Sequence, residues 1–146
     1  MNVSMSLKRK TEKVIRLLDE LAQLSADGAL IVVEGPNDVV ALRRLGVLGE
    51  VIPAKAMGKT FIDLVSELEL QEREVILLMD FDRRGREWTK RLAAYLERGR
   101  VRVNLHVWRG LQELVGREVK DVEGLTTYLE TVRRKMGEHI LSEWTL

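Results

Sequence analysis

Apolar residues in the first 27 positions recur at spacings of three and four, with charged residues between them. The members of this pattern are Val14, Ile15, Leu17, Leu18, Leu21 and Leu24. This spacing is typical of an amphipathic helix, and Asp27-Gly28 is a helix-ending signal because glycine accepts the left-handed conformation. The pattern therefore predicts a helix over 8–27 within an N-terminal helical extension, residues 1–28.

After residue 28 the pattern changes to short apolar runs that alternate with amphipathic segments. Continuous apolar runs predict buried strands, and an alternating run predicts a half-exposed strand at a sheet edge. The runs that predict strands are 29–33, 51–52 and 75–79, all continuous, and 101–107, which alternates. The predicted helices are 37–46, 61–70, 84–98 and 121–136. This alternation indicates an α/β fold with a mainly parallel sheet of about four strands, flanked by helices.

The chain has the length of one domain. Its 146 residues fall within the ~100–150 that single domains commonly have, and 45% of them are hydrophobic. No linker or internal repeat divides the sequence. We therefore assign the α/β domain to 29–136 and leave 137–146 as a C-terminal tail.

The charges of the chain nearly balance, with 24 basic and 23 acidic side chains and a net charge of +1. This balance excludes binding of nucleic acid by bulk charge alone, so an anionic partner must meet a local patch. Residues 80–120 carry 11 basic and 6 acidic side chains, which makes this region the candidate patch.

Several kinds of chemistry are excluded by residues that the chain lacks. The absence of cysteine removes disulfides, thiol catalysis and thiolate metal sites, and two histidines are few for a zinc site. No apolar run reaches the ~18 residues of a membrane span, and the first residues lack the apolar core of a secretory signal. We therefore expect a cytoplasmic protein without a membrane partner.

Acidic side chains directly follow two of the predicted strands. Glu34 follows the first, and Asp80 and Asp82 follow the third. Sites in parallel sheets lie beyond the carboxyl ends of the strands, so these carboxylates fall where a site is expected. Close carboxylates repel unless a cation or proton intervenes, and hard oxygen ligands favour Mg²⁺. The alternative is that the two aspartates only cap a helix or solvate a loop.

A glycine and three arginines follow the two aspartates. Gly85 allows a sharp turn into the next predicted helix, whose N-terminus favours anions. Arg83, Arg84 and Arg86 add positive charge beside the acids. A metal and arginines together suit a phosphodiester, so these arginines are candidates for binding nucleic acid.

The segments VVEGPNDV at 32–39 and LLMDFDRRG at 77–85 together resemble the motifs of the Toprim domain. That family includes bacterial-type primases, topoisomerases, OLD-type nucleases and the ribonuclease that matures 5S ribosomal RNA. Its pattern is a glutamate and a glycine after the first strand, here Glu34 and Gly35, and D-x-D after the third. The resemblance covers about 29–130 and implies a Rossmann-like Toprim fold.

The resemblance also implies a Mg²⁺-dependent centre for phosphoryl transfer or strand cleavage. Glu34 would be the general acid/base, or a metal ligand as in nucleolytic members. Asp80 and Asp82 would hold Mg²⁺, with Mn²⁺ as a possible substitute. Asp38 matches a second acidic residue that often follows the glutamate, and its alternative role is a helix cap.

The segment KDVEGLTTYLE at 120–130 resembles a stretch late in primase Toprim domains and the K-x-V-E-H region of the 5S-maturing ribonuclease. By this resemblance Lys120 would approach a phosphate, and Asp121 and Glu123 would lie near the metal. The chain has Val122 where primases have proline, and the alternative is a plain helix start.

Two other segments follow predicted strands. AKAMGKT is similar to a phosphate-binding loop but has Pro53 in place of the first glycine, so Lys59 and Thr60 are candidates for holding a phosphate or capping a helix. Trp108 and Arg109 follow the fourth predicted strand, where the ring could stack on a base and the guanidinium could bind nucleic acid.

The function expected from these features is a Mg²⁺-dependent nuclease or phosphotransferase that acts on nucleic acid, with RNA favoured over DNA. The alternative is a module that binds nucleic acid or a ribonucleoprotein without cutting it. A short chain without a separate substrate-binding domain favours dependence on a protein partner or on homo-oligomerisation.

Overall fold

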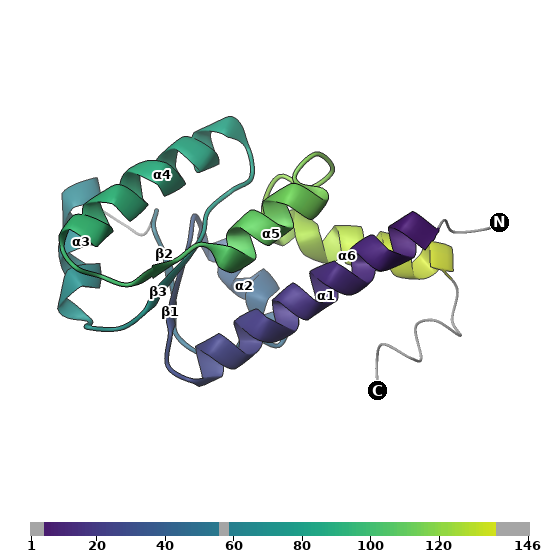
Figure 1. Cartoon of the computed structure of the whole chain (residues 1–146), viewed down its shortest axis with the longest axis horizontal. Helices are drawn as coiled ribbons and strands as arrows, with labels where there is room; N and C mark the ends of the chain where they lie inside the picture. The colour runs from purple at the N-terminus through teal and green to yellow at the C-terminus, as the bar shows by residue number, and fades with distance from the viewer. Residues whose placement is uncertain (1–4, 56–58, 137–146) are drawn as a thin grey trace.

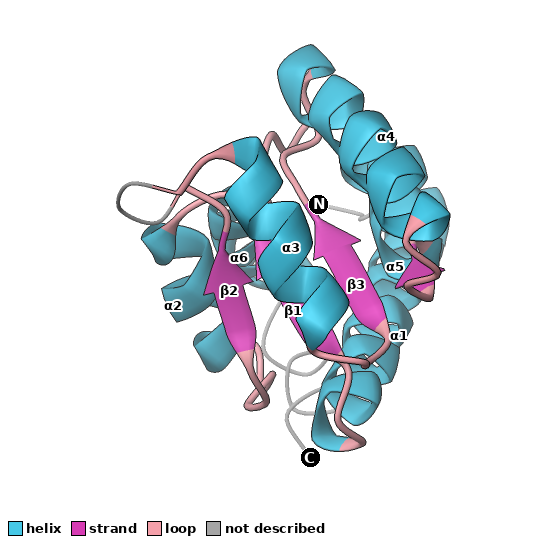
Figure 2. Ribbon diagram, turned by 90° about the vertical axis from the view of Figure 1, so that its left-hand side faces the viewer, coloured by secondary structure: helices cyan, strands magenta, loops and turns pink. Residues whose placement is uncertain are grey.

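The computed structural model describes residues 5–55 and 59–136, and within them a sheet of four parallel strands. The strands are β1 (Leu30–Val33), β2 (Val51–Pro53), β3 (Val75–Leu78) and β4 (Val103–Asn104). Their order is β2-β1-β3-β4, so β1 and β3 lie at the centre (Figure 2). The predicted α/β fold with a parallel sheet is confirmed.

Helices cover both faces of this sheet (Figure 1). In the described part of the chain they are α1 (Met5–Ala26), α2 (Pro36–Arg44), α3 (Phe61–Leu70), α4 (Arg83–Arg98), α5 (His106–Val115) and α6 (Val122–Met136). One core lies between the sheet and α3 and α4, and the other lies between the sheet and the remaining four helices. Every predicted helix is present, and α5 is an additional one.

Side chains of the central strands alternate between these two cores. In β1, Ile31 and Val33 point to the core shared with α1, α2, α5 and α6, whereas Leu30 and Val32 point to the core shared with α3 and α4. All side chains of β1 and β3 are buried. Burial on both faces explains why these strands are continuous apolar runs in the sequence.

The N-terminal helix α1 packs into the domain although it precedes the first strand. Its Val14, Leu18 and Leu21 are buried in the same core as α5. The two helices lie side by side along this face (Figure 1). The apolar pattern of the first 27 residues is thus satisfied by contact with the rest of the fold.

The structure corrects the fourth predicted strand, 101–107. β4 has two residues at the edge beside β3, and α5 begins at His106. Asn104 ends the strand because its side-chain Oδ1 accepts a hydrogen bond from the His106 backbone N at 2.9 Å. The residues that alternate in the sequence therefore belong partly to a helix, whose Val107 and Trp108 are buried.

None of the helices in the described ranges combines the length and the apolarity needed to cross a membrane. The tail predicted for 137–146 lies outside the described residues, as do residues 56–58 of the AKAMGKT segment.

Candidate functional site

The carboxyl ends of β1 and β3 lie side by side because the two strands are parallel neighbours in register. Glu34 directly follows β1, and Asp80 lies two residues after β3. The Glu34 side chain is buried, and its Oε1 accepts a hydrogen bond from the Asp80 backbone N at 3.2 Å. The two strand ends that carry the predicted acids therefore meet at one edge of the sheet.

Three aspartates at this edge form a group that we call the acid cluster: Asp38, Asp80 and Asp121. One carboxylate oxygen from each lies within 4.8 Å of the other two. Asp38 is buried in the first turn of α2, and Asp121 directly precedes α6. Segments that are far apart in the sequence thus bring three carboxylates together.

Backbone N–H groups at the starts of α2 and α6 hold two of these carboxylates. The N atoms of Gly35 and Glu123 donate to the two oxygens of Asp38, at 3.2 Å and 3.1 Å. The Gly124 N donates to Asp121 Oδ1 at 2.6 Å. The alternatives left open for both aspartates, helix capping and a place beside a metal, are therefore compatible with each other.

Burial and nearby acids raise the pKa of Asp80 to about 7. After burial, the acids that raise it are, in decreasing order, Glu34, Asp38, Asp121 and Asp82. Burial also raises the pKa of Asp38, against the opposing effect of its two backbone hydrogen bonds. The site thus concentrates negative charge that a bound cation would neutralise.

Asp82 caps a helix beside the acid cluster and is not a member of it. Its Oδ1 accepts a hydrogen bond from the Gly85 N at 2.8 Å, which caps α4. Its Oδ2 lies 3.8 Å from Lys120 Nζ, the lysine expected to approach a phosphate. The charge of Asp82 still acts on Asp80, so the two aspartates of D-x-D share one electrostatic environment.

Gly85 is required by space at the start of α4. A side-chain carbon at Gly85 would overlap the Asp80 carbonyl oxygen, because α4 starts directly against the end of β3. At Gly35, by contrast, nothing lies within 4 Å of the place that such a carbon would take. The first turn of α4 is thus pressed against the site.

Lys55 is a residue of the site that the sequence analysis missed. Its Nζ lies 3.2 Å from Glu34 Oε2, and its backbone N donates to the Glu34 carbonyl oxygen at 2.9 Å. The Lys55 side chain is 46% exposed, so it reaches both the buried glutamate and solvent. Lys55 follows β2, and the rule that sites follow parallel strands could have identified it.

The three predicted arginines lie at the start of α4. Arg83 forms an ion pair with Glu87 at 3.2 Å, and Arg86 Nη1 donates to the Phe81 carbonyl oxygen at 3.1 Å. Arg84 is exposed and has no ion-pair partner among the described residues. Arg84 is therefore the most available of the three for an external anion.

Lys59 and Thr60 directly precede α3, and Thr60 caps this helix. The Thr60 side-chain oxygen accepts a hydrogen bond from the Asp63 N at 3.1 Å, and Asp63 accepts one in return from the Thr60 N. Lys59 Nζ pairs with Glu67 at 2.5 Å. Of the two roles considered for this segment, the structure shows helix capping.

Trp108 and Arg109 lie in the first turn of α5. The Trp108 ring is buried, and its indole N–H donates to the Met79 carbonyl oxygen at 2.8 Å, so this ring is not free to stack on a base. Arg109 is exposed and lines a hollow that also contains Glu74 and Glu113. This hollow includes none of the acid-cluster residues.

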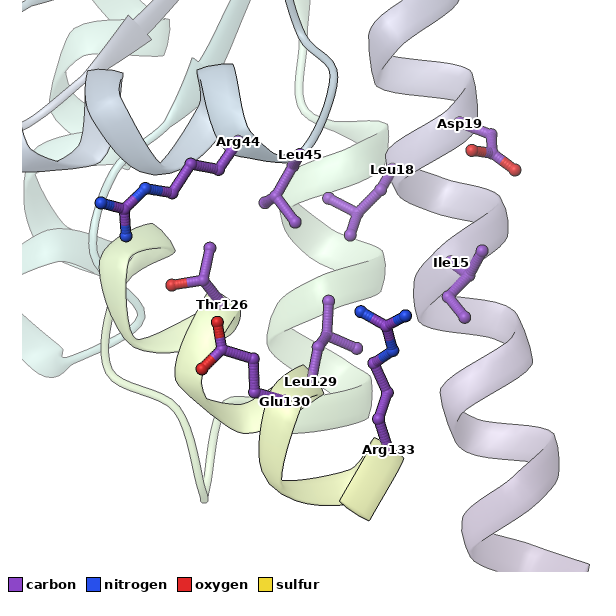
Figure 3. Close-up of a pocket in the computed structure, with 9 residues that line it drawn as sticks. All are labelled: Ile15, Leu18, Asp19, Arg44, Leu45, Thr126, Leu129, Glu130 and Arg133. Atoms are coloured by element: carbon purple, nitrogen blue, oxygen red, sulfur yellow. The ribbon is translucent and has the colours of Figure 1, made fainter. Parts of the chain in front are cut away.

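A cavity of about 350 Å³ lies between α1, α2 and α6 (Figure 3). Its lining residues are Ile15, Leu18, Asp19, Arg44, Leu45, Thr126, Leu129, Glu130 and Arg133. None of them belongs to the acid cluster, and Glu34 does not line this cavity.

The acid cluster has the donor set that suits a small divalent cation. Mg²⁺ takes oxygen ligands at about 2.1 Å, which places any two of them at most about 4.2 Å apart. The three carboxylates, within 4.8 Å of one another, need only small side-chain movements to reach that spacing. Carboxylate oxygens suit Mn²⁺ as well as Mg²⁺, so the cluster fits either ion.

A family model described as the Toprim domain matches residues 29–105. The match includes the glutamate-glycine motif after β1 and the D-x-D motif after β3, and it stops before Asp121. A Toprim domain indicates a metal-binding function related to nucleic acid.

The chain is also similar to UPF0292 proteins. It is 33% identical to one from Methanosarcina barkeri, over 89% of this chain and 90% of that protein. It is 37% identical to one from Thermococcus kodakarensis, over 78% and 81% of the two chains. A solved structure of a protein from Aquifex aeolicus superposes with a TM-score of 0.62 at 29% identity, over 74% of this chain and 94% of that one. The chain belongs to the Toprim domain family, and it is a relative of the UPF0292 proteins.

Proposed function

We propose that this protein is a Mg²⁺-dependent nuclease or phosphotransferase that acts on nucleic acid. The observation that carries the proposal is the convergence of Asp38, Asp80 and Asp121 within 4.8 Å, beside the buried Glu34. Carboxylates that raise one another's proton affinity are a common feature of catalytic and metal sites. A structural role alone would not need so many acids at one strand end.

The acid cluster is the proposed metal site, with Asp82 beside it as a further candidate ligand. When bound, a divalent cation neutralises charge on a phosphate oxygen and lowers the pKa of bound water. Glu34 is the proposed general acid/base. The Asp80 N–H donates to Glu34 Oε1, and Lys55 Nζ pairs with Glu34 Oε2. These two contacts hold the Glu34 carboxylate in one orientation at the edge of the sheet where the acids meet.

Basic side chains around the acids are proposed to bind the substrate backbone. Lys55 and Lys120 reach the site from after β2 and from before α6, and each contacts an acid there. Arg83, Arg84 and Arg86 extend positive charge along the first turn of α4. RNA is the favoured substrate because the segment at 120–130 resembles that of the 5S-maturing ribonuclease.

A second candidate is a binding module that holds nucleic acid without cutting it. The observation that favours it is the ion pair between Glu34 and Lys55, at 3.2 Å. Together with the hydrogen bond from the Asp80 N, this ion pair engages both oxygens of the carboxylate, as in a structural role.

The two candidates differ in what Glu34→Gln does. Labelled structured RNA and single-stranded DNA are incubated with the protein, with and without Mg²⁺. If the protein is an enzyme, turnover requires Mg²⁺ and falls at least about a hundredfold in Glu34→Gln, while nucleic-acid affinity is unchanged, since a general base typically contributes ~10²–10⁴-fold. Glu67→Gln, the same change at an ion-paired glutamate on α3, is the control and keeps full turnover. No Mg²⁺-dependent turnover in the wild type, with binding intact, would leave only the binding module.

A further inference from the structure

Aromatic and arginine side chains alternate along one side of α4. We call this set the α4 stripe; its members are Arg84, Trp88, Arg91, Tyr95 and Arg98. Their spacings of four, three, four and three place them on the same side of a helix. By a rise of about 1.5 Å per residue the stripe is about 21 Å long.

Three members of the stripe, Arg91, Tyr95 and Arg98, contact one another or Phe61 at the start of the neighbouring helix α3. The Arg91 Cζ lies 4.0 Å from the centre of the Phe61 ring, and the Arg98 Cζ lies 5.2 Å from that of Tyr95. The Phe61 and Tyr95 rings meet edge to face, with centres 5.1 Å apart. These planar groups of the two helices thus form one continuous surface.

The stripe is open to solvent and keeps its positive charge. Arg84, Arg91 and Arg98 are exposed, and none has an ion-pair partner in the described ranges 5–55 and 59–136. Tyr95 is 41% exposed, whereas Trp88 is half-buried against the core below it. Helix α4 has six basic residues and two acidic ones, and its Glu87 pairs with Arg83 rather than with an arginine of the stripe.

We infer that the α4 stripe, with Phe61, binds single-stranded nucleic acid by base stacking. Aromatic rings and guanidinium planes are the groups on which unpaired bases stack, and unpaired arginines attract the phosphates between them. A duplex keeps its bases stacked on one another and cannot use such a surface in this way. The inference rests on the proposed function, which makes nucleic acid the substrate. The stripe begins two residues after Asp82, so a nucleic-acid strand bound along α4 leads to the acid cluster.

The stacking part is tested with Tyr95→Ala and Tyr95→Phe. Binding of a fluorescent 20-nucleotide single strand without self-pairing, and of a 20-base-pair duplex, is measured by anisotropy in EDTA. Because stacking is worth about 1–3 kcal/mol per base, Tyr95→Ala should weaken single-strand binding at least about fivefold and leave duplex binding within about twofold. Tyr95→Phe keeps the ring and should bind as the wild type does. Melting temperatures check that each variant is folded.

The charge part uses arginines of the stripe and one lysine outside it. Arg91→Ala and Arg98→Ala each remove one charge from the stripe, and Lys90→Ala removes one charge from another side of the same helix. Each arginine variant should reduce single-strand affinity at least about threefold more than Lys90→Ala does, because a guanidinium contributes both stacking and charge.

Equal single-strand affinity in Tyr95→Ala and the wild type would overturn the inference. A loss that is the same for single strand and duplex, or a wild type that does not bind the single strand, would overturn it too. These measurements contain no divalent cation, so they are independent of turnover. If Glu34→Gln loses turnover but Tyr95→Ala binds the single strand as the wild type does, the proposed function stands. Only the inference that the α4 stripe binds single strands would then be wrong.

Discussion

The Asp80 carboxyl is the most strongly perturbed acid of the site. Its burial and the charges of four neighbouring acids raise its pKa to about 7. A carboxyl with such a pKa is partly protonated at neutral pH when no cation is bound, so protons and cations compete for the same oxygens. Metal binding should therefore strengthen as the pH rises from 6 to 8.

Replacement of this carboxyl tests the electrostatic account. Because the native state raises the pKa of Asp80, it binds the proton more tightly than the unfolded chain does between about pH 4 and 7. The unfolding free energy therefore falls as the pH rises through this window, and the ionised group is destabilising at pH 8. In EDTA, Asp80→Asn should melt about 3 °C or more above the wild type at pH 8, and this difference should shrink towards pH 5.

Asp63→Asn is a matched control with the opposite sign. Hydrogen bonds from the Thr60 backbone and side chain lower the pKa of Asp63, so its ionised form is stabilising. This variant should melt below the wild type at pH 8, with a difference that shrinks as the pH falls through the range where Asp63 is protonated. A melting difference for Asp80→Asn that does not change with pH would contradict the account.

Individual site residues differ in how far the sequence could identify them. Glu34 and Asp80 follow unmistakable apolar strands, so the rule for parallel sheets places both at one edge. Asp121 was expected near a metal only through a resemblance, because nothing in its own neighbourhood fixes where α6 packs. Lys55 belongs to the AKAMGKT segment, whose likeness to a phosphate-binding loop pointed to Lys59 and Thr60 instead.

At the scale of elements, the contact between α4 and the end of β3 determines where D-x-D can lie. Gly85 permits this contact because any side chain there would meet the Asp80 backbone. Asp82 caps the same helix, so the cap and the glycine fix the first turn together.

Two glycine substitutions test this packing. Gly85→Ala should reduce the free energy of unfolding by about 1–3 kcal/mol, as expected for overpacking against backbone that cannot move freely. Gly35→Ala should change it by no more than about 0.5 kcal/mol, because its position is open and its φ of −138° suits any residue. Urea denaturation measures the free energy of unfolding of both variants. Similar losses in the two would contradict the claim that the close contact at Gly85 makes glycine necessary there.

Helix α5 shows where the sequence pattern misleads. Residues 101–107 alternate as a strand does, but a local hydrogen bond from the His106 N to Asn104 ends the strand early. Burial of Trp108 against the Met79 carbonyl then fixes the helix that follows. The contact of Trp108 with Met79 joins residues 29 positions apart and depends on the sheet being formed, so the period of a short segment could not predict it.

At the scale of the whole molecule, the site exists because distant segments share one edge of the sheet. The strand order and parallel direction bring the ends of β2, β1 and β3 together, and the sequence pattern predicts the parallel direction. The third member of the acid cluster, Asp121, directly precedes α6, and α6 packs against α2. That packing follows from the tertiary fold, so it could not be read from strand and helix signals alone.

Cation binding by the acid cluster is the central claim, and Asp121→Asn tests it most directly, because Asp121 lies outside the matched Toprim region. Mn²⁺ is titrated calorimetrically into the wild type, Asp121→Asn and the control Asp63→Asn at pH 8. We expect weak binding by the wild type and the control, and at least about tenfold weaker binding by Asp121→Asn, since removing one of three carboxylates removes a ligand and a charge. Unchanged Mn²⁺ binding in Asp121→Asn would contradict the claim that these three aspartates form one metal site.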